Sequence, residues 1–262
     1  MNIISTRTFT QKYHVKTVVW LTLFVLLVIG TAKMTGVEFI MFFANFGQFT
    51  ALLQQMAKPD WQYTSLVVQP ILETIQMALI GTTVGTLVAI PFSVLAARNI
   101  VKNKFLRGII RFILNLVRTL PDLMLAALFV AIVGIGPVAG VFTLAIFSFG
   151  MISKLFYEAI ETIDEGPLEA LQAAGANKIQ MVVFAVIPQV FNYFVSYFLY
   201  TFEINVRAST VLGYLGAGGI GVYLQRSLDQ FAYGQTAIII LGILVVVLII
   251  DSVSNTLRER LL

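Results

Sequence analysis

Long apolar runs recur along this 262-residue chain and are separated by short polar segments. A membrane-spanning helix needs about 20 mostly apolar residues, and the uncharged runs lie near 17–32, 74–97, 123–153, 179–202 and 230–250. The third run is too long for one helix, and Gly134-Ile135-Gly136-Pro137 interrupts it with the residues of a tight turn. The pattern therefore predicts six spans, at about 17–34, 72–96, 112–133, 138–156, 186–208 and 234–254.

One further uncharged segment, residues 39–57, is rich in phenylalanine but is interrupted by Asn45, Gln48, Gln54 and Gln55. We interpret it as an interfacial helix on the outer membrane surface. The alternative is a seventh span, which would place the two termini on opposite sides of the membrane and break the asymmetry of basic residues.

The composition indicates an all-α integral membrane protein. Hydrophobic residues make up 58% of the chain and charged residues 11%, whereas a soluble domain carries about 25% charge. The chain has no cysteine and one histidine, His14, so disulfides and thiolate metal sites are excluded and a histidine metal site is not expected. In such a protein the net charge of +4 reports topology and does not indicate nucleic-acid binding.

The basic residues predict which ends of the spans lie in the cytoplasm. Six spans put both termini on one side, and 13 of the 17 lysines and arginines fall on that side. The positive-inside rule then places both termini and the loop after the fourth span in the cytoplasm. No small-residue cleavage site follows the first apolar run, so we expect that run to be a retained anchor. The thirteen are Arg7, Lys12, Lys16, Arg98, Lys102, Lys104, Arg107, Arg111, Arg118, Lys154, Lys178, Arg258 and Arg260.

The loop over residues 157–187 has the pattern of a helix, a glycine turn and a second helix. Gly166-Pro167 favours a helix start, and Gly175 can close that helix in a left-handed conformation. Asn177 can cap a second helix, which runs into Pro188. Small alanines on the first helix allow another protein to approach closely, although a plain amphipathic connector on the membrane surface would have a similar pattern.

This loop resembles the motif shared by permease subunits of ATP-binding-cassette (ABC) importers: Glu-Ala-Ala, three residues, Gly, nine residues, Ile, one residue, Leu-Pro. The chain matches it at Glu169, Ala170, Gly175 and Pro188. It departs from the motif only by other small or apolar residues, at Leu171, Ala185 and Ile187. The resemblance implies the six-helix, type I (MetI-like) importer permease fold, and a coupling helix that inserts into a groove of a separate ATPase. The expected coupling residues are Glu165, Gly166, Pro167, Glu169, Ala170, Ala173, Ala174, Gly175, Asn177 and Pro188.

Other segments are similar to the phosphonate-type permeases in particular. They are Arg118–Asp122, Gly134–Gly140, Lys154–Glu158, Glu161–Pro167 and Glu203–Gly213. The resemblance covers about 71–262, which we expect to be the transmembrane core. Residues 1–70 carry little of it and are expected to hold the N-terminal tail, the first span and the outer-face segment.

Charged residues within spans need a pairing or functional reason, because a charge near the bilayer centre costs about 2.5–3.5 kcal/mol. Glu203 and Arg207 are four residues apart on one predicted helical face. They could form a purely structural pair, or Arg207 could attract an anion through its planar fork while Glu203 restrains it. Arg118 and Asp122 share this spacing near the predicted inner end of the third span, and we interpret them as a structural pair.

The glycine-rich segment 213–221 lacks the Lys-Ser/Thr of a phosphate-binding loop. Resemblance to related importers implies that it forms an outer turn that dips toward the pore and contributes to a gate. The expected residues of the translocation path or gate are Glu203, Asn205, Arg207, Ser209, Thr210, Gly216, Gly218 and Gly219.

We therefore expect a permease of the bacterial cytoplasmic (inner) membrane that imports phosphonate or a related phosphorus oxyanion (phosphite or phosphate) by alternating access. The chain contains no nucleotide-binding motif, so ATP and Mg are expected on a separate ATPase, and no catalytic or metal-binding residue is expected. Expected partners are a second permease copy, two ATPase subunits, an extracytoplasmic binding protein and membrane lipid. The alternatives are a heterodimer, an importer of methionine or a vitamin precursor, and an ion-coupled secondary transporter.

Overall fold

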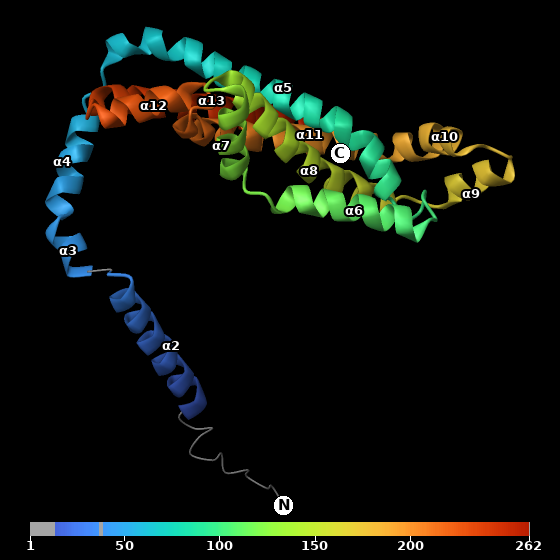
Figure 1. The fold of residues 1–262 in the computed structure, drawn as a ribbon, viewed down its shortest axis with the longest axis horizontal. Coiled ribbons are helices and arrows are strands. Elements are labelled where there is room, and N and C mark those ends of the chain that lie inside the picture. Colours follow the sequence, from blue (N-terminus) through green and yellow to red (C-terminus); the bar gives the residue numbers. More distant parts are fainter. Residues whose placement is uncertain (1–13, 37–38, 262) are drawn as a thin grey trace, which may run out of the picture. The chain divides into compact units, whose positions relative to one another are not determined.

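The computed structural model describes residues 14–36 and 39–261, which form helices and turns without any strand (Figure 1). The chain divides into two compact units, one up to Gln54 and one from Gln55 onward. Within the described residues, five helical segments are long and apolar enough to cross a membrane, or six if α6 and α7 together count as one span. The all-helical prediction is therefore confirmed.

The N-terminal unit holds α2 (Val15–Met34), which confirms the helix predicted at 17–34. Residues 39–57 form α3 (Phe39–Ala44) and α4 (Phe46–Met56). Neither reaches the roughly 20 residues that a span needs, so a seventh span is not formed, while the interfacial position stays a prediction. The basic tail before His14 lies outside the described residues.

Four long helices form the second unit: α5 (Thr64–Ala96), α8 (Pro137–Glu161), α11 (Ile187–Leu212) and α13 (Tyr233–Leu261), with a short 3-10 turn, η1 (Trp61–Tyr63), before α5. Helix α8 lies at the centre and packs on α5, α6, α7 and α11. Glycines on α5 permit this close packing. A Cβ at Gly85 would lie 2.4 Å from the Ala145 carbonyl oxygen, and one at Gly81 would lie 2.6 Å from the Leu144 Cβ. The small-residue step on α5 thus serves packing within the subunit.

The third predicted span, 112–133, is wrong as a single helix. The chain forms α6 (Lys104–Thr119) and α7 (Asp122–Val133), whose axes differ by 86°. Pro121 lacks a backbone N–H and forces the preceding residue out of the helical region. Leu120 accordingly has φ −74° and ψ 122°. Figure 1 shows α7 turning away from the direction of α6.

Shorter elements connect the long helices. After α8, the loop forms α9 (Gly166–Ala173) and α10 (Lys178–Met181), and a π-helical turn, η2 (Val182–Val186), joins α10 to α11. Both α9 and α10 project from one end of the unit (Figure 1). A 3-10 turn, η3 (Gly213–Leu215), follows α11, and α12 (Ile220–Asp229) precedes α13. Helix α12 was not predicted from the sequence.

Candidate coupling loop and intramembrane charge cluster

The boundaries of α9 follow from the residues predicted to set them. Gly166 and Pro167 occupy its first turn, and the Asp164 side chain accepts the Gly166 N–H at 3.0 Å. At the other end Gly175 has φ +81°, and its N–H donates to the Gln172 carbonyl at 3.0 Å. The Ala176 N–H donates to the Leu171 carbonyl at 2.9 Å, which completes a Schellman C-cap.

The cap of the next helix is also confirmed. Asn177 accepts the Gln180 N–H at 2.9 Å, and the Gln180 side chain accepts the Asn177 N–H at 2.8 Å. This reciprocal pair is a capping box. Pro188 is the second residue of α11 and directly follows the π-helical turn η2, within a helical segment that runs from Lys178 to Leu215. Because proline has no backbone N–H, the regular hydrogen-bond pattern is interrupted at this point of the segment.

Helix α9 is attached to the long helices by one buried side chain, Leu168, and by a hydrogen bond between Asp164 and Gln189, which we call the Asp164–Gln189 clamp. Leu168 is buried in a cluster that includes Ala97 of the segment after α5, Ile160 of α8 and Val190 of α11. Gln189 of α11 accepts the Asp164 N–H at 3.0 Å. A displacement of α9 would therefore act directly on the ends of three long helices.

The opposite side of α9 is open and suits a partner protein. Glu169, Ala170, Ala173 and Ala174 are all exposed. Beside them lies a hollow of about 490 Å³, between α9, α10 and the segment after α5. Lys102 and Lys178 contribute positive charge to its lining. The surface thus offers one carboxylate, small side chains that allow close approach, and an adjacent basic hollow.

A polar network near the base of this loop was not predicted. Glu161, at the end of α8, accepts the Arg98 N–H at 2.6 Å and pairs with the Arg111 guanidinium. Arg111 also donates to the Ala96 carbonyl at 2.8 and 2.9 Å and lies 4.6 Å from the centroid of the Tyr157 ring. The network caps the C-terminal end of α5 and joins it to α6 and α8.

The predicted Glu203–Arg207 pair forms on α11 and belongs to a larger cluster with α13. Arg207 lies 3.6 Å from Asp251, and Arg258 lies 3.1 Å from the second carboxylate oxygen of Glu203. Asn255 accepts from Arg258 at 2.8 Å. Glu203 is buried, whereas half of the Arg207 side chain is exposed. The negative charges of two carboxylates and the positive charges of two guanidinium groups thus neutralise one another between two apolar helices, α11 and α13.

The prediction that Arg118 and Asp122 form an ion pair is wrong. Among the described residues, no ion pair joins these two side chains. The bend at Pro121 places them on different helices, so their four-residue spacing no longer puts them on one face. The stem of Arg118 instead packs near Gly150, halfway along α8. Asp122 is the first residue of α7, and its side chain accepts the Leu123 N–H at 3.0 Å.

Asn205 is fully buried and does not share the open face of Arg207. Its side-chain amide donates to Thr82 of α5 at 2.7 Å and to Ser148 of α8 at 2.6 Å. Two further predicted path residues, Ser209 and Thr210, form hydrogen bonds within their own helix. The Ser209 hydroxyl donates to the Val206 carbonyl, and the Thr210 hydroxyl donates to the Arg207 carbonyl. Asn205 thus ties three helices together at their crossing.

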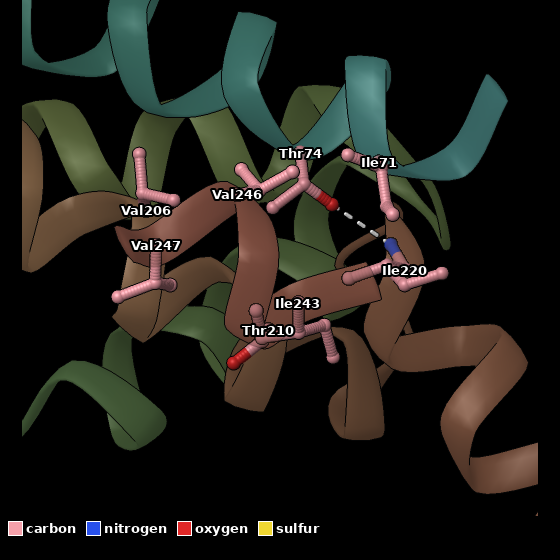
Figure 2. A pocket seen from close by; sticks show the side chains of 8 residues that line it. All are labelled: Ile71, Thr74, Val206, Thr210, Ile220, Ile243, Val246 and Val247. Carbon is pink, nitrogen blue, oxygen red and sulfur yellow. Dashed lines mark hydrogen bonds between the residues drawn. The ribbon is translucent and has the colours of Figure 1, made fainter. Parts of the chain in front are cut away.

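The glycine turn packs tightly between α5 and the α7–α8 connection. Gly216, Gly218 and Gly219 all have positive φ values, of 83°, 82° and 70°, which L-residues rarely adopt. A Cβ at Gly219 would lie 2.5 Å from the Thr74 hydroxyl oxygen. That hydroxyl accepts the Ile220 N–H at 2.8 Å, at the start of α12 (Figure 2).

Figure 2 also shows the mostly apolar side chains that, together with Thr74, line a small cavity. The cavity between them measures about 10 Å³, which leaves room for at most one water molecule. Thr210 lies in its lining. The glycine turn is therefore a well-packed joint between α11 and α12. No group of histidine, cysteine or acidic residues within the described ranges could hold a metal ion.

Comparisons with known proteins agree with this arrangement. The family described as "Binding-protein-dependent transport system inner membrane component" matches residues 89–261. The phosphite transport system permease protein PtxC of Stutzerimonas stutzeri is 40% identical over 202 residues, which cover 77% of this chain and 74% of that protein. The phosphate-import permease protein PhnE of Mycolicibacterium smegmatis (strain ATCC 700084 / mc(2)155) is 38% identical over 81% of this chain and 40% of its own length.

Among solved structures, an inward-facing conformation of the MetNI methionine ABC transporter has a TM-score of 0.69. The match covers 78% of this chain and 99% of that chain, at 23% sequence identity. At this level of identity the likeness concerns the fold.

Proposed function

Because this chain belongs to the family of binding-protein-dependent transport system inner membrane components, we propose that it forms the membrane path of an ATP-driven importer for a phosphorus oxyanion. Phosphonate, phosphite and phosphate share the tetrahedral, anionic chemistry that this proposal requires. The observation that carries it is the 40% identity to a phosphite permease over three quarters of both chains. The chain is an inner-membrane transport subunit and not an enzyme, as the permease relatives indicate.

The proposed assembly contains two permease copies, two ATPase subunits and an extracytoplasmic binding protein. One coupling loop per chain supports two permeases for two ATPases, most simply as a symmetric homodimer. Both termini and α9 lie in the cytoplasm in this proposal, which the distribution of basic residues supports. ATP and Mg bind to the ATPase partner, since the chain has no phosphate-binding loop sequence.

In the proposed mechanism, the ATPase groove receives the open side of α9 around Glu169 and Ala170. When the ATPases close on ATP, they displace α9. Leu168 and the Asp164–Gln189 clamp then transmit that displacement to the long helices. The helices reopen toward the outside, where the binding protein delivers its anion.

For the translocation path we propose Glu203 and Arg207 as its charged residues. Ser209, Thr210 and the turn containing Gly216, Gly218 and Gly219 would form its outer joint and gate. Their packing against α5 and α8 supports movement of this joint as a unit. Asn205 would hold the helix crossing below that joint.

The variant Glu169→Lys tests the coupling step. It reverses the charge on the exposed side of α9 and leaves the buried Leu168 in place, so we expect a folded permease whose transport is lost. Transport and ATP hydrolysis should be measured together in vesicles that contain the complete transporter. Glu259→Lys, an equal charge reversal at an exposed residue near the end of α13, is the control and should transport normally. Unchanged uptake by Glu169→Lys would refute the coupling role.

A further inference from the structure

The long helices of the second unit expose two kinds of surface. Helix α5 exposes aliphatic residues such as Leu79 and Leu87, and α13 does the same with Leu244 and Leu248. Such side chains suit contact with lipid. Helix α11 and the turn after it expose apolar residues such as Phe191 and Val211. They also expose a set of polar residues: Tyr193, Tyr200, Arg207 and Tyr214.

These four residues lie on one narrow stripe, which we call the tyrosine–arginine stripe. They are spaced seven residues apart, and seven residues make almost two helical turns. From Phe194 to Val206 every residue except Tyr200 is buried or half-buried. The stripe extends over about 30 Å at the helical rise per residue.

A half-exposed guanidinium is not stable against lipid tails. The side chain of Arg207 is 52% exposed, and we expect water or an anion to cover it in the membrane. The hydroxyls of the tyrosines that precede and follow Arg207 along the stripe would add neutral hydrogen-bond donors on the same face. Arginine and hydroxyl donors together suit a tetrahedral oxyanion, because the guanidinium fork can donate two parallel hydrogen bonds.

We propose that the tyrosine–arginine stripe lines the water-filled path and binds the phosphorus oxyanion, with Arg207 as the main anion site. The inference rests on the proposed function and adds the residues that recognise the transported anion.

The charge cluster provides a means of releasing Arg207 to its ligand. In this conformation Arg207 is held by Glu203 and Asp251. Glu203 already has Arg258 as a second partner, at 3.1 Å from its other oxygen. When an oxyanion takes Arg207, Glu203 keeps a cation beside it, and no carboxylate is left buried without a partner.

Cysteine accessibility tests the stripe cleanly, because the chain contains no cysteine of its own. Tyr200→Cys and Leu87→Cys would be made in the full chain, within the complete transporter in phosphatidylcholine vesicles, and treated with a charged, water-soluble methanethiosulfonate reagent. A thiol reacts as the thiolate, which forms in water and not in hydrocarbon. We expect Tyr200→Cys to be labelled, phosphite to suppress that labelling, and Leu87→Cys to stay unlabelled.

Three results would overturn the inference. Tyr200→Cys could resist labelling as Leu87→Cys does, which would place it against lipid. It could form a disulfide between two permease copies, which would make the stripe a packed dimer contact. Anionic phosphatidylglycerol vesicles could block the labelling without added phosphite, which would identify a lipid headgroup as the ligand.

Uptake of labelled phosphite by the same vesicles separates this inference from the proposed function. Tyr200→Phe removes one hydroxyl donor, and we expect KM to rise roughly three- to tenfold, as the loss of one hydrogen bond implies. Tyr197→Phe is the matched control, since Tyr197 lies on the same helix but packs against the buried Phe156. If the parent transporter takes up phosphite and Tyr200→Phe is unaffected, only the inference fails. If the parent takes up no phosphorus oxyanion, the proposed function fails.

Discussion

At the scale of single residues, Glu161 connects three helices through one carboxylate. We expect Glu161→Gln to lower the free energy of unfolding by about 1–3 kcal/mol, because the charged hydrogen bonds to Arg111 and to the Arg98 N–H are weakened. The measurement is thermal unfolding of the purified permease in detergent.

Glu158→Gln is the matched control on the same helix. Glu158 is half-exposed and pairs with Lys154 at 3.4 Å, and exposed pairs of this kind contribute about 0–1 kcal/mol. Equal losses of stability in the two variants would contradict the role given to Glu161.

Local residue patterns could be predicted from the sequence, whereas distant partners could not. The Glu203–Arg207 pair follows from a four-residue spacing on one helix. The partnership of Glu203 with Arg258 joins residues 55 positions apart and depends on how α13 packs on α11. Nothing in the residue spacing along the chain indicates this contact.

At the scale of helices, the crossing of α5 and α8 depends on the absence of a side chain at Gly85. We expect Gly85→Ala to destabilise the protein by about 1–3 kcal/mol, as overpacking does in a close-packed interior. The new Cβ would meet the Ala145 carbonyl oxygen at 2.4 Å, which only a backbone shift can relieve. Thermal unfolding in detergent measures the loss.

Gly108→Ala provides the comparison, since Gly108 lies inside α6 and a Cβ added there would meet no atom within 4 Å. There alanine should stabilise the helix by about 0.5–1 kcal/mol, because it reduces the entropy lost on folding. If both alanine variants shift the midpoint in the same direction, the packing explanation for Gly85 is wrong.

Helix boundaries were predictable where the signals are local. Pro167, Gly175 and Asn177 define α9 and α10 as expected, and the structure forms a Schellman cap at Gly175 and a capping box at Asn177. The break at Pro121 was missed because the apolar run from residue 123 to 133 is too short for a span. The prediction therefore extended the helix upstream through Pro121 to reach the length of a span. Helix α12 was missed because its mixed polar sequence lacks an apolar run and depends on Thr74 for its first hydrogen bond.

At the scale of the whole molecule, the buried anchor and open face of α9 lie at one end of the second unit, and the tyrosine–arginine stripe runs along α11. Gln189 clamps the loop to the beginning of that same helix. In the proposed mechanism, this connection lets ATP-driven displacement of α9 change the face that contacts the anion. In this proposal α11 receives the displacement because it continues directly from the loop.

Import driven by ATP is tested most directly by uptake of radiolabelled phosphite into vesicles that contain the permease, its ATPase and its binding protein, with ATP supplied and no ion gradient. We expect accumulation that requires ATP and the binding protein and is reduced by competing phosphonate. Uptake that is indifferent to ATP, or uptake of methionine in place of phosphite, would contradict it.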